Sequence, residues 1–133
     1  MNRQVNEACI ALQTALHDRP MYQTEHPDPA GVLLQLQQVL EADLSFYSSL
    51  FTSSGATSAA AKIRNVFVEY MLEHENEFAI QDHNRYLFGL MFASGGVISM
   101  YQDWFGGKLP ITLDQLTAQA IDVTRSIAAI SSR

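Results

Sequence analysis

Cysteine is the scarcest reactive residue of the sequence, because Cys9 is the only one among 133 residues. A single cysteine cannot form a disulfide within its own chain, and this favours a reducing compartment. The N-terminal residues Met1–Gln4 lead into a mixed polar and apolar stretch, not into the apolar run of a signal peptide. We therefore expect a cytoplasmic protein.

Long apolar runs and basic residues are also scarce. No stretch reaches the roughly 18 consecutive apolar residues of a transmembrane helix, so we expect no membrane span. The chain has 8 Lys and Arg against 14 Asp and Glu, for a net charge of −6. Because affinity for nucleic acids depends largely on basic side chains that neutralise phosphates, we expect this chain to make no direct contact with DNA or RNA.

Motifs for catalysis and metal binding are missing as well. The sequence contains no nucleophile elbow, no phosphate-binding glycine loop and no pair of cysteines. His74 and His83 have acidic neighbours, but their spacing is not that of a zinc-binding helix, which favours solvated surface histidines. Cys9 falls on the apolar face of a predicted helix, where burial makes a thiol unreactive. We predict no catalytic residue, no metal and no cofactor.

Helical periodicity is what the sequence does contain. Hydrophobic residues make up 47% of the chain and charged residues 17%, which favours an oligomer or a large internal pocket. No alternating strand pattern occurs. We predict one all-α domain over residues 1–133, a bundle of five to six helices. The expected elements are a helix over 2–17, a loop over 18–28, a helical segment over 29–51 that breaks near 41–43, a helix over 57–75, and two final helices over 86–105 and 112–130.

The last two predicted helices show the strongest pattern. The helix over 86–105 is apolar around nearly its whole circumference, whereas a surface helix needs one apolar stripe. Asp82 suits its N-cap, Gly106 and Gly107 suit its end, and Thr112 with Gln115 has the spacing of a capping box for the next helix. We predict an antiparallel pair that packs against a second copy of itself, so that a four-helix bundle forms the interface of a homodimer. The predicted interface residues are Phe92, Gly96, Ser99, Leu113, Leu116, Ala120, Val123 and Ile127.

Aromatic side chains and a methionine at helical spacing suggest a pocket between helices. Apolar walls with a few hydroxyl groups suit a small, mostly apolar ligand. Each such residue taken alone fits ordinary core packing better, because aromatic and methionine side chains at this spacing usually fill space. The predicted ligand-binding residues are Phe46, Tyr47, Phe67, Tyr70, Met71, Tyr86 and Leu90.

Several of these stretches carry a family likeness. They are the run 46–51 followed by Gly55, the run 86–90, and a tail with Gly95 or Gly96, Trp104–Gly107 and a Thr112 that opens the last helix. With them, residues 29–130 resemble the C-terminal domain of TetR-type transcriptional regulators, in the short form common in Gram-positive bacteria. The resemblance implies a domain that binds a small-molecule effector and dimerises.

The same resemblance assigns the first helix a connecting role. Residues 1–17 resemble the helix that joins the regulatory domain to an N-terminal helix-turn-helix domain, which is not present in this sequence. DNA would then be bound through that missing domain. An alternative from another class is a stand-alone helical module that binds another protein without binding DNA. A small helical-bundle enzyme ranks last, for want of a catalytic constellation.

Overall fold

The computed structural model describes residues 2–18, 30–53, 55–75 and 80–131. This part of the chain is helical and contains no strand, which confirms the predicted all-α bundle. The predicted loop over 18–28 falls outside the described residues, except for Asp18, which ends the first helix. The helices are α1 Asn2–Asp18, α2 Ala30–Ala42, α3 Leu44–Thr52, α4 Ala56–Glu73, α5 His83–Phe105 and α6 Leu113–Ser131.

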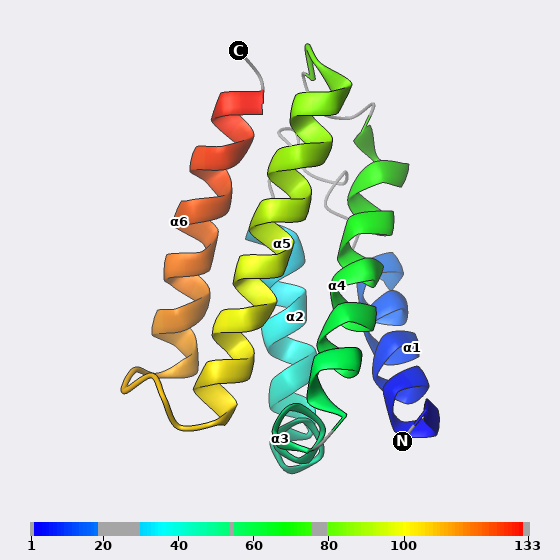
Figure 1. Cartoon of the computed structure of the whole chain (residues 1–133), viewed down its shortest axis with the longest axis vertical. Coiled ribbons are helices and arrows are strands. Elements are labelled where there is room, and N and C mark those ends of the chain that lie inside the picture. The colour runs from blue at the N-terminus through cyan, green and yellow to red at the C-terminus, as the bar shows by residue number, and fades with distance from the viewer. Residues whose placement is uncertain (1, 19–29, 54, 76–79, 132–133) are drawn as a thin grey trace.

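The long helices form a bundle around α5 (Figure 1). Helix α5 lies between α4 and α6 and runs opposite to both, and α2 packs against α6. Helix α1 packs on the outside against α2 and α4. Helix α3 lies across one end of the bundle, where it contacts α4 and α5. Two sides of α5 are therefore covered by the helices that precede and follow it along the chain.

Helix ends follow the chemistry that the sequence predicts. The Asp82 carboxylate accepts a hydrogen bond from the Arg85 backbone N–H at 3.2 Å, as an N-cap does. Thr112 and Gln115 form the reciprocal capping box, with bonds of 2.9 and 3.1 Å. Gly107 has a φ of +76°, a left-handed conformation that favours glycine and ends α5. These three predictions are confirmed.

The predicted break in the second helical segment is also confirmed. Helix α2 ends at Ala42 and α3 begins at Leu44, so the turn is at Asp43. The Asp43 carboxylate accepts a hydrogen bond from the Phe46 backbone N–H at 3.1 Å and caps α3. The phenyl ring of Phe51 in α3 stacks on Phe105 at the end of α5, with ring centroids 5.4 Å apart. Helix α3 thereby closes this end of the core.

Specific hydrogen bonds fix α6 against its neighbours. The Tyr101 hydroxyl of α5 and the Thr117 hydroxyl of α6 lie 2.6 Å apart in a buried position. The Trp104 indole N–H donates to the Ile111 carbonyl at 2.8 Å, across the turn that joins α5 to α6. The Gln37 amide of α2 donates to the Asp114 carboxylate of α6. These contacts set the register of α6 along α5 and α2.

The apolar face of α1 differs slightly from the predicted one. Helical spacing predicts that Val5, Cys9, Leu12 and Leu16 share this face, with Ala8 beside them. Val5, Ala8, Leu12 and Leu16 are buried, whereas Cys9 is only half-buried. Ala8 belongs to the core that α1 forms with α2 and α4. Burial still raises the pKa of the Cys9 thiol. The nearby charge of Lys62 lowers this pKa by a smaller amount and that of Glu69 raises it, so the thiolate is scarce at neutral pH.

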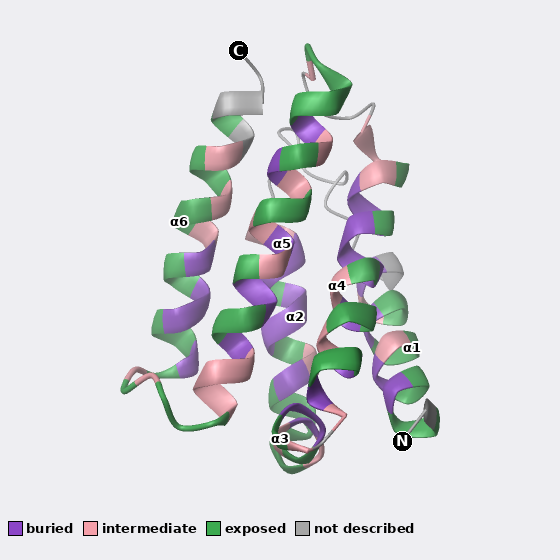
Figure 2. Cartoon of the chain, viewed as in Figure 1, coloured by how far each residue is buried: buried purple, intermediate pink, exposed green. Residues whose placement is uncertain are grey.

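Large apolar side chains remain exposed along the outer side of α5. Figure 2 shows exposed residues down the side of α5 that faces the viewer. Phe88 is 72% exposed and Phe92 is 69% exposed, and their rings lie 6.3 Å apart. Helical spacing places Gly96 and Ser99, both exposed, on the same side. We call Phe88, Phe92, Gly96 and Ser99 the outer face of α5.

None of the described helices is long and apolar enough to cross a bilayer.

Candidate functional site

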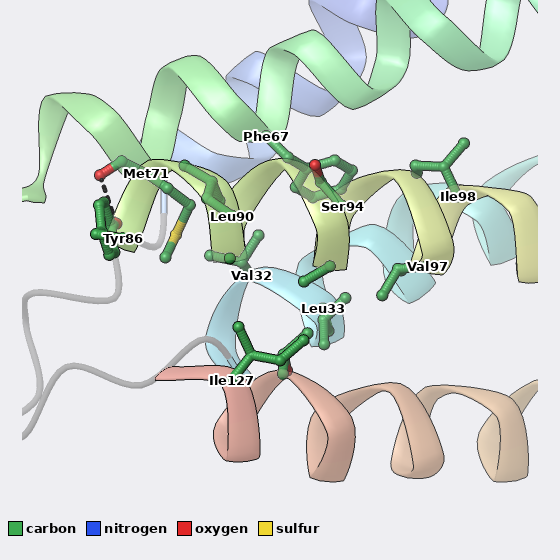
Figure 3. A pocket seen from close by; sticks show the side chains of 13 residues that line it. Val32, Leu33, Phe67, Met71, Tyr86, Leu90, Ser94, Val97, Ile98 and Ile127 are labelled. Carbon is green, nitrogen blue, oxygen red and sulfur yellow. Dashed lines mark hydrogen bonds between the residues drawn. The ribbon is translucent and has the colours of Figure 1, made fainter. Parts of the chain in front are cut away.

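An apolar pocket lies between α2, α4, α5 and α6 (Figure 3). Its volume is about 80 Å³. Helix α5 supplies about half of the wall, from residues one turn apart that face inward. The lining residues are Val32, Leu33, Phe67, Met71, Tyr86, Gly89, Leu90, Ala93, Ser94, Val97, Ile98, Thr124 and Ile127. The pocket is therefore built from four helices that only the folded bundle brings together.

Four of the predicted ligand-binding residues line this pocket: Phe67, Met71, Tyr86 and Leu90. Figure 3 shows Tyr86 and Met71 at one end and Phe67 beside Ser94 nearer the middle. Phe67 and Met71 are one turn apart on α4, and Tyr86 and Leu90 are one turn apart on α5. Because these two helices pack together, the two pairs share one wall.

The other three predicted residues lie elsewhere. Tyr47 is buried in α3, where Phe46 packs against its ring edge-to-face at 5.0 Å. Tyr70 is buried in α4 and its ring packs on His74, with centroids 4.4 Å apart. Helix α3 lies at the end of the bundle, away from the residues that line the pocket. These three side chains serve the core and its edges.

Sequence reasoning missed the small and aliphatic part of the wall. Gly89, Ala93 and Ser94 leave space because their side chains are small or absent, and Val32, Leu33, Val97, Ile98 and Thr124 complete the lining. Ile127 also lines the pocket, although the sequence analysis placed it in the dimer interface. The available signal was the inward spacing of Tyr86, Leu90, Ala93 and Val97 on α5.

Tyr86 supports the end of the pocket next to the start of α5. Its hydroxyl donates a hydrogen bond to the Met71 carbonyl of α4 at 3.1 Å, which ties α5 to α4 (Figure 3). Burial raises the pKa of Tyr86, and the charge of Glu75 adds to the increase. The phenol therefore stays protonated at neutral pH and keeps its hydrogen for this bond.

The predicted dimer residues fall into two groups. On α6, Leu113, Leu116 and Ala120 are buried within the chain's own core, each at most 8% exposed. Phe92, Gly96 and Ser99 are exposed on the outer face of α5, and Val123 of α6 is 55% exposed. The apolar stripe of α6 is thus used mainly within one chain. Of the predicted interface residues, Phe92, Gly96, Ser99 and Val123 are the ones that stay exposed on the chain.

The histidines interact with nearby groups in and around the end of α4. His83 Nδ1 lies 2.7 and 2.8 Å from the two carboxylate oxygens of Glu75. His74 Nδ1 lies 2.8 Å from the Tyr70 carbonyl. Among the described residues, no three His, Cys, Asp or Glu side chains are grouped so as to hold a metal ion.

Comparison with known proteins gives no relative for this chain: no protein-family model, no curated protein and no solved structure matches it.

Proposed function

We propose that this chain is a small-molecule-sensing and dimerising domain of a TetR-type transcriptional regulator. The observation that carries the sensing role is the apolar pocket among α2, α4, α5 and α6, in which Phe67, Met71, Tyr86 and Leu90 meet. Pockets with predominantly apolar walls and a few hydroxyl groups are typical ligand sites. The resemblance of residues 29–130 to such regulatory domains supports the same role.

A ligand in this pocket acts on the packing of the helices. It touches α2 and α4, and α1 packs on both of these helices along its buried face. The ligand shifts the balance between two packings only by the difference between its affinities for them. In the proposed mechanism α1 transmits the shift to a helix-turn-helix domain outside these 133 residues. DNA is contacted by that domain, because the sensing chain carries a net charge of −6.

Dimerisation is proposed through the outer face of α5. Phe88 and Phe92 are mostly exposed, and exposed apolar patches of this kind mark interaction surfaces. A second copy that meets the same face about a twofold axis buries both rings from each chain. Gly96 lets the two backbones approach closely, because it has no side chain. Val123 of α6 borders this surface in the proposed arrangement.

The same exposed rings favour one alternative, a stand-alone module that binds a different protein. Native mass spectrometry of the purified chain separates the two proposals. A mass of two chains with a bound small molecule supports dimer and sensor together. Two chains with nothing bound support the dimer alone. A single chain contradicts the dimer and favours the protein-interaction module.

A further inference from the structure

Two charged side chains border the outer face of α5 without a counter-ion from their own chain. Arg64 of α4 and Asp103 of α5 are both half-buried. Within the described part of the chain, neither side chain forms an ion pair, whereas the exposed Arg3 and Glu7 do so at 3.4 Å. Partial burial of a charge is unfavourable unless an opposite charge or a hydrogen-bond partner compensates for the lost hydration. A partner that supplies the opposite charges is therefore favoured at this face.

The side chain of Arg64 packs on α5 next to the outer face. Its Cδ lies 3.9 Å from the position that a Cβ of Gly95 would occupy. Its Nε is buried and has no hydrogen-bond acceptor among the described residues. The other end of the guanidinium reaches the surface, where Nη2 lies 3.5 Å from Asn65 Oδ1, at the outer limit of a hydrogen bond. A guanidinium has five N–H donors, so this one can still bind a carboxylate.

Asp103 supplies a carboxylate on the same side of α5. It follows Gly96 by seven residues and Ser99 by four, which places the three residues on one face of the helix. The eight residues from Gly95 to Asp103 span about 12 Å along α5. Ser99 is halfway between them and is exposed. The face thus carries a positive group at one level and a negative group at another, with Ser99 at the midpoint.

A twofold axis at Ser99 brings the opposite charges together. When two copies of α5 lie antiparallel across such an axis, residues equally far from it on either side face one another. Arg64, at the level of Gly95, then faces Asp103 of the second copy, and the same pair forms again at the other end. The two arginines are about 12 Å apart along the helix, beyond the Debye length of about 8 Å, so their repulsion is largely screened. A parallel pair of helices would place each charge at the level of its own copy.

The uncharged part of the outer face fits the same arrangement. Gly96 and Ser99 lie nearest the axis, where small residues let the two backbones approach closely. Phe92 precedes Ser99 by seven residues and therefore lies opposite Gly106 of the second copy, which is exposed and has no side chain. The phenyl ring, 69% exposed on the single chain, is then covered by the turn that follows α5 in the second copy.

We propose that the outer face of α5 binds an antiparallel second copy, held in register by two symmetric ion pairs between Arg64 of one chain and Asp103 of the other. This inference rests on the proposed dimerisation and adds the arrangement of the two chains and the residues that select it. Charge pairs that are partly buried at an interface are screened less than exposed ones, and they fix both register and partner.

Charge reversal tests the ion pairs. Arg64→Glu and Asp103→Arg each bring like charges together at both ends of the interface. Each is expected to raise the dimer Kd at least about tenfold, measured by sedimentation equilibrium of the full chain at about 0.15 M salt. The double variant Arg64→Glu with Asp103→Arg restores the pairs in reverse and should recover most of the affinity. Lys62→Glu is the matched control, because Lys62 is exposed on α4 and its charge acts on Cys9 of α1. It should leave Kd nearly unchanged.

A cross-link at the axis tests the register without changing a charge. In a chain that carries Cys9→Ala, and so has no other thiol, Ser99→Cys places two thiols beside each other across the axis. Oxidation should then give a covalent dimer on denaturing electrophoresis without reductant, because a disulfide needs Cα atoms about 4.4–6.8 Å apart. Asn84→Cys is the control. Asn84 is exposed on α5, 15 residues from Ser99, so it lies about 45 Å from its copy and should stay uncrosslinked.

The outcomes separate this arrangement from the dimerisation on which it rests. A dimer whose Kd is unchanged by the single reversals, or is not recovered in the double variant, overturns the ion pairs. A chain that dimerises but gives no cross-link at Ser99, or cross-links equally well at Asn84, overturns the axis at Ser99. In both cases the dimer itself stands. A wild-type chain that sediments as a single chain at every concentration contradicts the proposed dimerisation.

Discussion

The substitution Gly96→Leu is expected to have opposite effects on the stability of a single chain and on its dimerisation. A Cβ at Gly96 would meet no described atom within 4 Å, so one chain has room for a side chain there. Gly96→Leu also replaces a poor helix former within α5, which stabilises the helix by about 0.5–1 kcal/mol. The single chain should therefore fold as well as the wild type or slightly better.

The proposed dimer responds in the opposite direction. Two helices that approach closely at Gly96 must move apart for a leucine, and overpacking of this kind costs about 1–3 kcal/mol at each site. A twofold axis places the substitution on both sides of the interface, so the cost per dimer is about 2–6 kcal/mol. At 1.4 kcal/mol for each tenfold change, the dimer Kd rises by about 30-fold to more than 10,000-fold.

Sedimentation equilibrium over a range of concentrations measures this Kd, and circular dichroism at 222 nm with urea measures the stability of the fold. Gly95→Ala is the matched control, because a Cβ there faces Arg64 of α4 at an ordinary 3.9 Å. It should stabilise α5 and leave the dimer intact. Ile10→Ser is a second control, since Ile10 is an exposed apolar residue of α1 that is 61% accessible. An unchanged dimer Kd in Gly96→Leu would refute an interface at the outer face of α5.

Three further predictions concern the stability of the single chain and are measured by urea unfolding at one fixed protein concentration. Thr117→Val should cost about 1–3 kcal/mol, because the buried Tyr101 hydroxyl loses its partner at 2.6 Å. Tyr101→Phe should lower the free energy of unfolding by less, because the Thr117 hydroxyl can turn to a carbonyl of its own helix. An equal loss in the two variants would contradict this difference. Thr112→Ala should cost about 1 kcal/mol by removing the cap of α6, while a substitution at exposed Gln119 should cost little. The free energy of unfolding should fall as pH rises above about 10. Burial raises the pKa of Tyr86 in the folded chain, so above that pH the tyrosine of the unfolded chain loses its proton while the folded one keeps it, and this favours unfolding. A flat profile between pH 9 and 11 would contradict a buried, protonated Tyr86.

Much of the fold follows from local chemistry that the sequence displays. Capping residues act on backbone groups within one turn, so Asp82 and the Thr112–Gln115 pair could be identified without knowing any tertiary contact. The break near Asp43 is local in the same sense. Periodicity likewise identified the inward faces of the helices, because burial requires a continuous apolar stripe.

Which helix covers each apolar stripe was harder to predict. The stripe formed by Leu113, Leu116 and Ala120 shows that α6 buries one side, but spacing cannot distinguish the chain's own core from that of a partner. In the structure the chain's own α2 and α5 take that side. The sequence prediction of the dimer surface therefore included residues that the single chain already buries.

The pocket was only partly predictable for a related reason. A hollow exists where side chains are small, so Gly89 and Ala93 define it as much as the aromatic residues do. Its walls also join Val32 and Thr124, which are far apart in the sequence and meet only through the packing of α2 and α6. No local pattern carries that information.

The bond between the Trp104 indole and the Ile111 carbonyl has a consequence for spectroscopy. Trp104 is the only tryptophan in the sequence, and it lies where α5 turns into α6, edge-on to Phe105 at 5.1 Å. Its fluorescence therefore reports on one corner of the bundle, at the end of α5 opposite Tyr86. Ellipticity at 222 nm reports on all the helices together. If that corner opens before the rest of the chain, the emission transition in urea will precede the ellipticity transition, and a single curve fitted to either signal will describe only part of the unfolding.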